Sequence, residues 1–156
     1  MGNYSEIVFS ARLRKDTPEK VLDFLEWYFS ARGIDEKYGP GLPDHEFFTK
    51  PRWDMLPNAA SASYTSPFSR FKRKISERDF WAGYPEVQIR CNIKNYAEEL
   101  ESFVDWILPY TDGDGYGDTL YGYIKNEDGR YVHLIFADGI ATAEPEDKPN
   151  TAEVLV

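Results

Sequence analysis

EIVFSARLR at residues 6–14 and EVQIRCNIK at residues 86–94 are the two stretches that decide the fold. In each, apolar and polar residues alternate, which is the pattern of a β-strand with one buried and one exposed face. The two stretches also match position for position, so that Cys91 in the second corresponds to Ala11 in the first. The sequence therefore predicts two equivalent strands of one sheet.

Each predicted strand is followed by a segment with the periodicity of an amphipathic helix. Thr17 before Pro18 favours a helix start with Thr17 as the N-cap, and Pro109 favours a helix end. Two unrelated strand–helix units would share much of this periodicity, so the repeat is a hypothesis. The apolar residues recur at i, i+3, i+4 and i+7: Val21, Phe24, Leu25 and Tyr28 in the first segment, and Leu100, Phe103, Val104 and Ile107 in the second.

Further strands are predicted after each helix. Residues 119–125 and 130–137 alternate, and the turn residues 126–129 between them indicate a hairpin. After the first helix, strands are expected at residues 61–65 and 68–75. The predicted order is β-α-β-β-α-β-β. This order favours an α+β fold, a ferredoxin-like sandwich in which an antiparallel sheet carries both helices on one face.

The domain organisation follows from the segments between these elements. Residues 1–143 are expected to form a single α+β domain. Residues 38–58 are an insertion with four prolines and several large apolar residues, and so are expected to pack as a lid or an extra layer. Residues 144–156 are acidic and are expected to form a mobile tail.

Composition restricts the class of protein. The 156 residues are 42% hydrophobic and 16% aromatic, which suits one folded domain. No apolar run approaches the roughly 20 residues of a membrane-spanning helix. The single cysteine allows no internal disulfide, so a reducing compartment such as the cytoplasm is expected. The net charge of −9 argues against indiscriminate binding to DNA.

Strand alternation predicts a basic sheet face opposite the helices. If Ile7 faces the helices, Arg12 faces the other way, and the same reasoning places Tyr121 beside Tyr123, opposite Leu120. The carboxylates are expected on the helices and the tail. The predicted partner-binding residues are the cations, tyrosines and histidine assigned to this face, together with Trp53 of the insertion: Arg12, Arg14, Arg70, Lys72, Lys74, Arg90, Lys94, Tyr121, Tyr123, Lys125, Tyr131, His133 and Trp53.

Such a face has three interpretations. Tyrosine and arginine are enriched where proteins bind one another. They also bind single-stranded nucleic acid, in which bases stack on aromatic rings. The third interpretation is internal pairing of the cations with the insertion or the tail. The glycine-aromatic signature of RNA-binding sheets is missing from both central strands, which disfavours the second interpretation.

The sequence predicts no catalytic residues, no cofactor and no metal site. His45 lies beside carboxylates in a loop, His133 lies on a strand, and Cys91 is expected on the core face, where a thiol ionises poorly. The stretch TDGDGYGD at residues 111–118 follows a helix, whereas a phosphate-binding loop precedes one. It also departs from the calcium-loop spacing, because Tyr116 stands where an oxygen ligand belongs. A cation there is left open.

One segment resembles a known group of proteins. Residues 87–136 are similar to uncharacterised small phage and prophage proteins with a KNY…E…F..W..PY segment. The residues that carry this likeness are Lys94, Asn95, Tyr96, Glu99, Phe103, Trp106, Pro109 and Tyr110.

The resemblance implies a mobile-element protein acting in a bacterial cytoplasm. A non-enzymatic inhibitor that binds a host protein complex, such as an anti-phage defence or nuclease system, is the resulting expectation. Its acidic helices could mimic phosphates while the basic sheet grips an acidic patch. A toxin-immunity protein and a single-stranded nucleic-acid-binding module are the alternatives. The oligomeric state is left open.

Overall fold

The computed structural model describes residues 4–30, 38–76, 82–113, 119–137 and 140–145, with the side chains of Phe136 and Ala137 left aside. Its elements in chain order are β1 (Tyr4–Leu13), α1 (Glu19–Tyr28), the 3-10 helices η1 (Glu46–Thr49) and η2 (Trp53–Asn58), β2 (Phe68–Lys72), β3 (Glu86–Lys94), α2 (Glu99–Ile107), the 3-10 helix η3 (Leu108–Tyr110), β4 (Thr111–Asp112), β5 (Thr119–Lys125), β6 (Tyr131–Ala137) and β7 (Ile140–Pro145).

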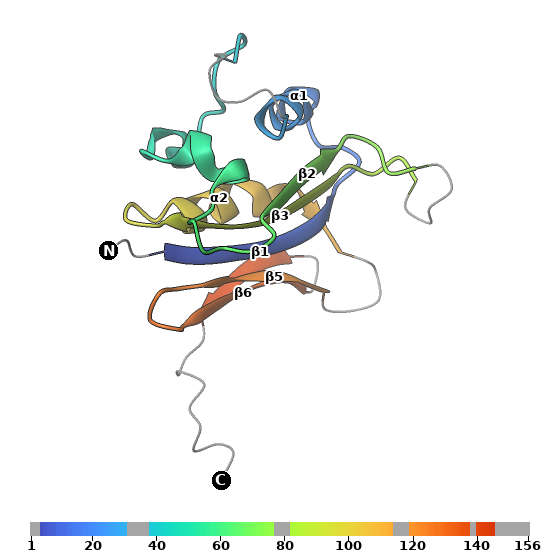
Figure 1. The fold of residues 1–156 in the computed structure, drawn as a ribbon. Helices are drawn as coiled ribbons and strands as arrows, with labels where there is room; N and C mark the ends of the chain where they lie inside the picture. The colour runs from blue at the N-terminus through green and yellow to red at the C-terminus, as the bar shows by residue number, and fades with distance from the viewer. Residues whose placement is uncertain (1–3, 31–37, 77–81, 114–118, 138–139, 146–156) are drawn as a thin grey trace.

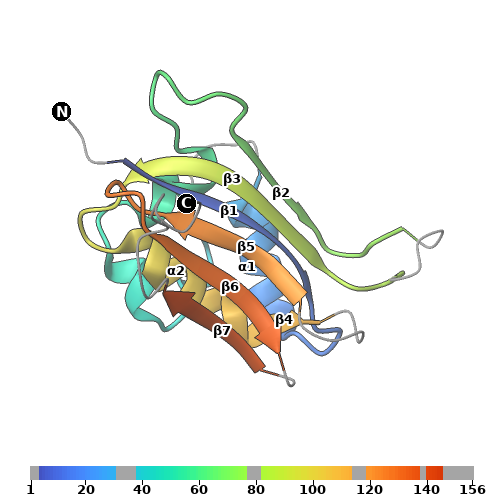
Figure 2. The ribbon, with the colours of Figure 1, turned by 90° about the horizontal axis from the view of Figure 1, so that it is seen from below.

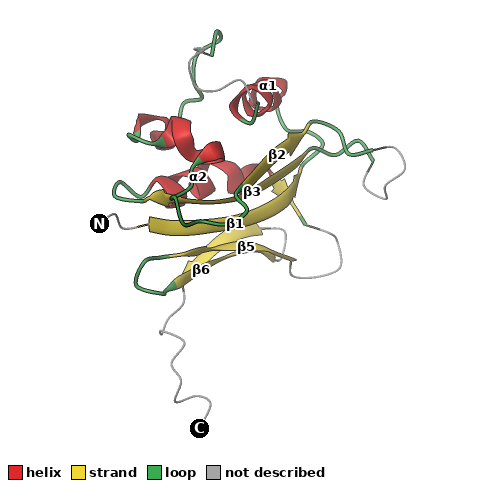
Figure 3. Ribbon diagram, viewed as in Figure 1, coloured by secondary structure: helices red, strands yellow, loops and turns green. Residues whose placement is uncertain are grey.

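The strands form one antiparallel sheet in the order β2-β3-β1-β5-β6-β7, and the short β4 pairs with the end of β1. The helices lie on one face of this sheet (Figures 1 and 3), and Figure 2 shows the other face without a described helix over it. The predicted α+β fold with helices on one face is confirmed. The sheet has more strands than a ferredoxin-like sandwich.

The two stretches with matching patterns pair with each other at the centre of the sheet. Ile7 lies opposite Cys91 and Phe9 opposite Ile89 in the antiparallel register of β1 and β3, and all four side chains are buried. Phe103 of α2 packs edge-on against Phe9, with ring centroids 6.4 Å apart. The alternation in both strands therefore buries one continuous apolar face beneath the helices.

The insertion is a packed layer on the helix face. Phe47, Phe48 and Leu56 belong to the main hydrophobic core, and the Phe47 ring lies 5.5 Å from that of Phe103. The hydroxyl of Tyr28 in α1 donates a hydrogen bond to the carbonyl of Trp53. The two short helices of the insertion thus pack against both α1 and α2.

The ends of several elements differ from the prediction. α1 begins at Glu19 with Pro18 as its N-cap, because the Thr17 hydroxyl instead donates to the carbonyl of Arg14 at 2.5 Å. Residues 61–65 form a turn and not a strand, because the Tyr64 N–H donates to the carbonyl of Ser61 at 3.0 Å. β2 ends at Lys72, short of the predicted residue 75.

The prediction missed two strands, β4 and β7. β4 is formed by Thr111 and Asp112, the first residues of the aspartate-glycine stretch. β7 pairs along its full length with β6 and takes in Glu144 and Pro145, which were predicted to belong to the tail. Residues 146–156, the remainder of the predicted tail, lie outside the described residues.

A bulge in β5 overturns the predicted placement of Tyr121. The β5–β6 register shifts between Leu120 and Gly122, which turns Tyr121 toward the core and Leu120 toward solvent. Tyr121 is 5% exposed and its ring lies 6.0 Å from that of Phe9, whereas Leu120 is 64% exposed. The prediction that Tyr121 shares the open face with Tyr123 is therefore wrong.

Candidate binding surface

The open sheet face, defined as the face opposite the helices, carries most of the predicted partner-binding residues. Directly opposed residues of neighbouring strands share a face, so the register places the following side chains on it: Arg12, Arg70, Lys72, Arg90, Lys94, Tyr123, Lys125, Tyr131 and His133.

The other predicted residues lie elsewhere. Arg14 and Lys74 follow the ends of β1 and β2. Trp53 packs on the helix side, where its ring stacks on Tyr28 at 6.0 Å. Tyr121 is in the core. The structure therefore brings together the strand residues and separates Trp53 from them.

Glu6 is at the centre of the open sheet face and was not predicted as a site residue. Its carboxylate accepts a hydrogen bond from the Tyr64 hydroxyl at 2.6 Å and lies 3.5 Å from the Tyr123 hydroxyl. The Arg90 guanidinium is 3.8 Å from the same carboxylate and lies over the Tyr64 ring. Burial, reinforced by Glu6, raises the pKa of Tyr64 and of Tyr123 above the ordinary tyrosine value. Both phenols therefore stay protonated and can donate.

Tyr64 reaches this face from outside the strands. It follows the insertion, in a segment tied to β3 by Asn92, whose side chain accepts from the Ser61 N–H and donates to the Ser61 hydroxyl at 3.0 Å. These two bonds bring the chain around the β3 edge. The sequence indicates that Glu6 lies on the open sheet face, because it occupies a polar position of the first strand. It does not indicate which residues contact Glu6.

Aromatic rings continue across β5 and β6. The rings of Tyr123 and Tyr131 lie 5.3 Å apart, and Tyr131 stacks on His133 at 6.2 Å with an angle of 21° between the planes. The ammonium group of Lys125 lies 5.8 Å from the centre of the Tyr131 ring. A cation and three rings thus form one contiguous surface, which can bind a flat or an apolar group.

Several cations of the face are paired within the chain. Arg70 contacts the Glu86 carboxylate at 3.0 Å, and Lys94 lies over the Tyr4 ring at 5.9 Å. Arg12 donates to the carbonyl of Gly113. These partners belong to β1, to β3 and to the residue after β4, and not to the insertion or the tail with which pairing was expected. The predicted separation of charge is also incomplete, because Glu6 and Glu86 place negative charge among the cations.

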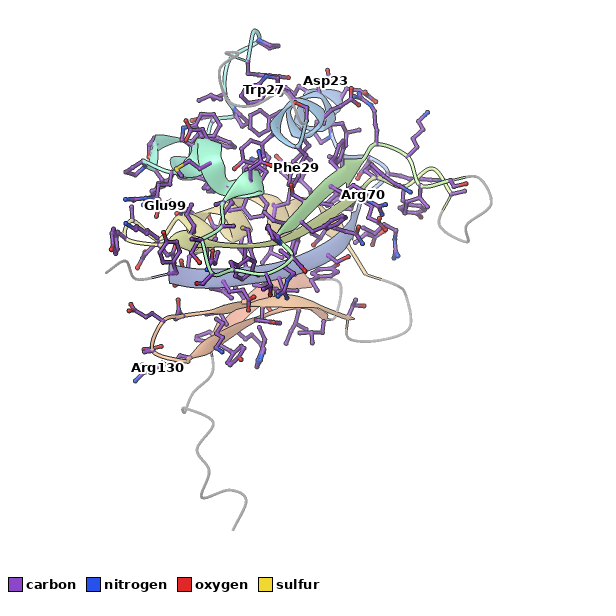
Figure 4. The ribbon with its side chains drawn as sticks, viewed as in Figure 1. Asp23, Trp27, Phe29, Arg70, Glu99 and Arg130 are labelled. Carbon is purple, nitrogen blue, oxygen red and sulfur yellow. The ribbon has the colours of Figure 1, made fainter. Side chains whose placement is uncertain are left out.

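The helix carboxylates have cationic partners as well. Arg73, just beyond β2, contacts Asp23 of α1 at 2.7 Å and also binds Glu19 of the same helix. These hydrogen bonds raise the pKa of the Arg73 guanidinium. Buried Glu99 of α2 lies 3.4 Å from Arg52 of the insertion. Figure 4 shows Asp23 on α1 and Glu99 on the helix side of the sheet, with Arg70 at the β2 edge.

His45, considered as a catalytic candidate, has a local structural role. Its Nδ1 accepts a hydrogen bond from the Phe47 N–H at 3.0 Å, which caps η1, and its Nε2 lies 2.9 Å from the Asp105 carboxylate.

Within the described residues no cluster of three metal-ligating side chains occurs. In the aspartate-glycine stretch, Asp112 lies in β4, whereas residues 114–118 are outside the described part of the chain. No helix in the described ranges is long and apolar enough to cross a membrane.

Cys91 provides a pH-dependent prediction. Burial, with a smaller effect of Glu6, raises the pKa of its thiol from 9.0 to about 12. The folded state then holds this proton more tightly than the unfolded chain, so the stability it contributes is complete below about pH 9 and is lost as pH rises toward 12. Urea unfolding between about pH 9 and 10 should show a loss of about 1 kcal/mol that is smaller in Cys91→Ala. Equal slopes in both proteins would contradict this assignment.

Comparison of the chain with family models, with curated proteins and with solved structures finds no match to any of them. The class that fold and site define is an α+β chain with helices on one face of its sheet. The other face carries interleaved tyrosines, cations and carboxylates.

Proposed function

We propose that the chain is a non-enzymatic interaction protein of a phage or similar mobile element, and that it inhibits a host protein complex such as an anti-phage defence or nuclease system. Its scaffold is a ferredoxin-like sandwich extended by β6 and β7, and its contact surface is the open sheet face. The observation that carries the proposal is the Glu6 cluster, in which one carboxylate holds Tyr64 and Tyr123 beside Arg90.

Preorganisation supports a role in protein binding. Tyrosine and arginine lose conformational freedom when they bind, and this cost is smaller if their positions are fixed beforehand. Tyr64 is hydrogen-bonded to Glu6, Arg90 lies 3.8 Å from the same carboxylate, and Arg70 contacts Glu86 at 3.0 Å, so each side chain has a partner that favours one position. A surface that alternates in sign also selects a partner with the complementary pattern, which gives specificity.

Single-stranded nucleic acid is the second candidate, because the adjoining rings of Tyr123, Tyr131 and His133, of which the last two stack, suit bases. The carboxylates oppose it. Glu6 and Glu86 lie on the two central strands, β1 and β3, where a phosphate backbone would follow the face. They would repel the phosphates and occupy the guanidinium groups of Arg90 and Arg70.

Affinity capture from a bacterial host tests the proposal. The chain is expected to recover one stoichiometric protein complex, and Tyr123→Ala and Arg90→Glu should each weaken it by about tenfold or more, because both lie in the preorganised cluster. Lys20→Glu, an exposed charge reversal in α1, is the matched control and should retain binding. Thermal unfolding of each variant verifies folding.

Gel-shift titration with single-stranded RNA gives the opposing result. Micromolar RNA binding that weakens with salt and disappears in both cluster variants would overturn protein inhibition in favour of nucleic-acid binding.

A further inference from the structure

β7 forms one outer edge of the sheet. It pairs with β6 over its full length, from Ala137 opposite Ile140 to Val132 opposite Pro145. Among the strands in the described ranges, none pairs with its other side. An edge strand directs a row of backbone N–H and C=O groups outward, which can pair with another strand.

The two edges of the sheet differ in how they are protected. β2 at the opposite edge carries the cations Arg70 and Lys72. Charges of this kind discourage the addition of another strand. β7 has the sequence IATAEP, with small or apolar side chains from Ile140 to Ala143 and its carboxylate and proline only at the far end. Its first four residues therefore lack those protective features.

A groove of about 1070 Å³ runs beside β7 on the helix side of the sheet. Ile140, Ala141, Thr142 and Ala143 all contribute to its wall. Side chains of a strand alternate between faces, so four consecutive residues can line one groove only if the groove follows the strand edge. The apolar part of its other walls comes from α2, η3, β5 and β6: Val104, Leu108, Ile124 and Val132.

Apolar side chains are also exposed on the opposite side of this edge. Ile140 is 63% exposed, and exposed Leu120 lies directly across from Ile135 in the β5–β6 register. An added strand would lie beside Ile140 and reduce its exposure to water. Apolar surface therefore flanks the β7 edge on both faces of the sheet.

The charges at the groove select its occupant. Four carboxylates and two cations line it: Asp16, Glu101, Asp105 and Asp112 with Arg14 and Lys15. Arg14 and Asp16 pair with each other at 2.9 Å, which leaves three carboxylates against Lys15. Asp105 is 79% exposed. A second copy of the chain carries a net charge of −9, and residues 144–156 hold four carboxylates and one lysine. The acidic rim disfavours both and favours a basic segment.

We propose that β7 accepts an additional β-strand from another protein, an extended segment whose groove-facing alternate side chains are both apolar and basic and enter the groove between β7 and α2. Main-chain hydrogen bonds to the β7 edge supply affinity, and the groove with its carboxylates supplies specificity. The groove lies on the helix side of the sheet and includes no residue of the Glu6 cluster, so this proposal does not depend on the function proposed above.

A labelled peptide of about nine residues tests the proposal on the full chain, with valine and lysine alternating at the positions that face the groove and threonine at the others. At a concentration about ten times its Kd, it should slow hydrogen exchange of the β7 amides by about tenfold. A peptide with proline at alternate positions, which lacks N–H donors, should not bind. Asp105→Lys should weaken binding about fivefold, whereas the same reversal at exposed Glu127 in the β5–β6 turn should retain it.

Several results would overturn this interface. They are no binding at about 1 mM peptide, binding without protection of the β7 amides, and equal binding of the same peptide with glutamate in place of each lysine. Light scattering that shows a dimer would assign the edge to a second copy. Much tighter binding after removal of residues 146–156 would assign it to the chain's own C-terminal segment. Arg90→Glu should leave peptide binding unchanged, which separates this test from that of the open sheet face.

Discussion

Gly122→Ala is expected to lower the free energy of unfolding by at least about 3 kcal/mol. Gly122 lies opposite Phe9 in β5 and has a φ of 148°. A Cβ atom there would lie 1.9 Å from the carbonyl oxygen of Val8 and 2.8 Å from its carbonyl carbon. Both neighbours are backbone atoms of a central strand, so no side-chain rotation relieves the contact. Urea denaturation monitored by tryptophan fluorescence measures the loss.

Gly129→Ala is the matched control for backbone conformation. Gly129 in the β5–β6 turn also has a positive φ, 86°, but a Cβ atom there would meet nothing within 4 Å. The expected loss is about 1 kcal/mol, the ordinary cost of a left-handed conformation in a residue with a side chain. Equal losses in the two variants would contradict the importance of the approach of Gly122 to Val8.

The same glycine explains where prediction of the sheet failed. Strict alternation through residues 119–125 assigns Tyr121 and Tyr123 to one face. The shift at Gly122 removes one step from that alternation, and a shift of one residue moves a side chain to the other face. A glycine within a strand indicates a bulge or a close backbone approach, but the pattern alone does not say which neighbour it approaches.

The central fold was predictable because its signal is local. Alternation in β1 and β3 and the helical periodicity after each depend only on residues close in sequence, and the structure confirms that Ile7, Phe9 and Ile89 face the helices. β7 was missed because its small residues give little contrast between faces. β4 was missed because two residues form a strand only when β1 lies beside them.

The binding surface was predictable as a list of side chains, and its interactions were not. Strand parity placed Arg90 and Tyr123 on the open sheet face correctly. It could not show that Glu6 links them, or that Tyr64 arrives from another segment, because those contacts join residues 58 and 117 positions apart in the chain. Arg73 and its α1 partners are a similar case. The alternation of a strand predicts the face on which a charged side chain lies. Which charged side chains pair depends on the tertiary fold.

Phe47→Ala is expected to lower the free energy of unfolding by about 3–5 kcal/mol. Phe47 is 0% exposed, and its ring packs at 5.0 Å from Phe48, 5.5 Å from Phe103 and 6.5 Å from Tyr28. Its removal leaves a cavity between the insertion and both helices, lined by large rings that cannot easily close it. Denaturant unfolding should retain a single transition with a lower midpoint.

Two further variants identify the role of the insertion. Phe47→Leu keeps most of the buried volume and should recover more than half of the loss. Met55→Ala, at a residue of the same insertion that is 44% exposed, should cost less than about 1 kcal/mol. If the insertion were a separate lid, Phe47→Ala would detach it while β1, β3 and α2 unfolded at an unchanged midpoint. A single transition at a lower midpoint would instead mean that the insertion and the sheet unfold together, as parts of one core.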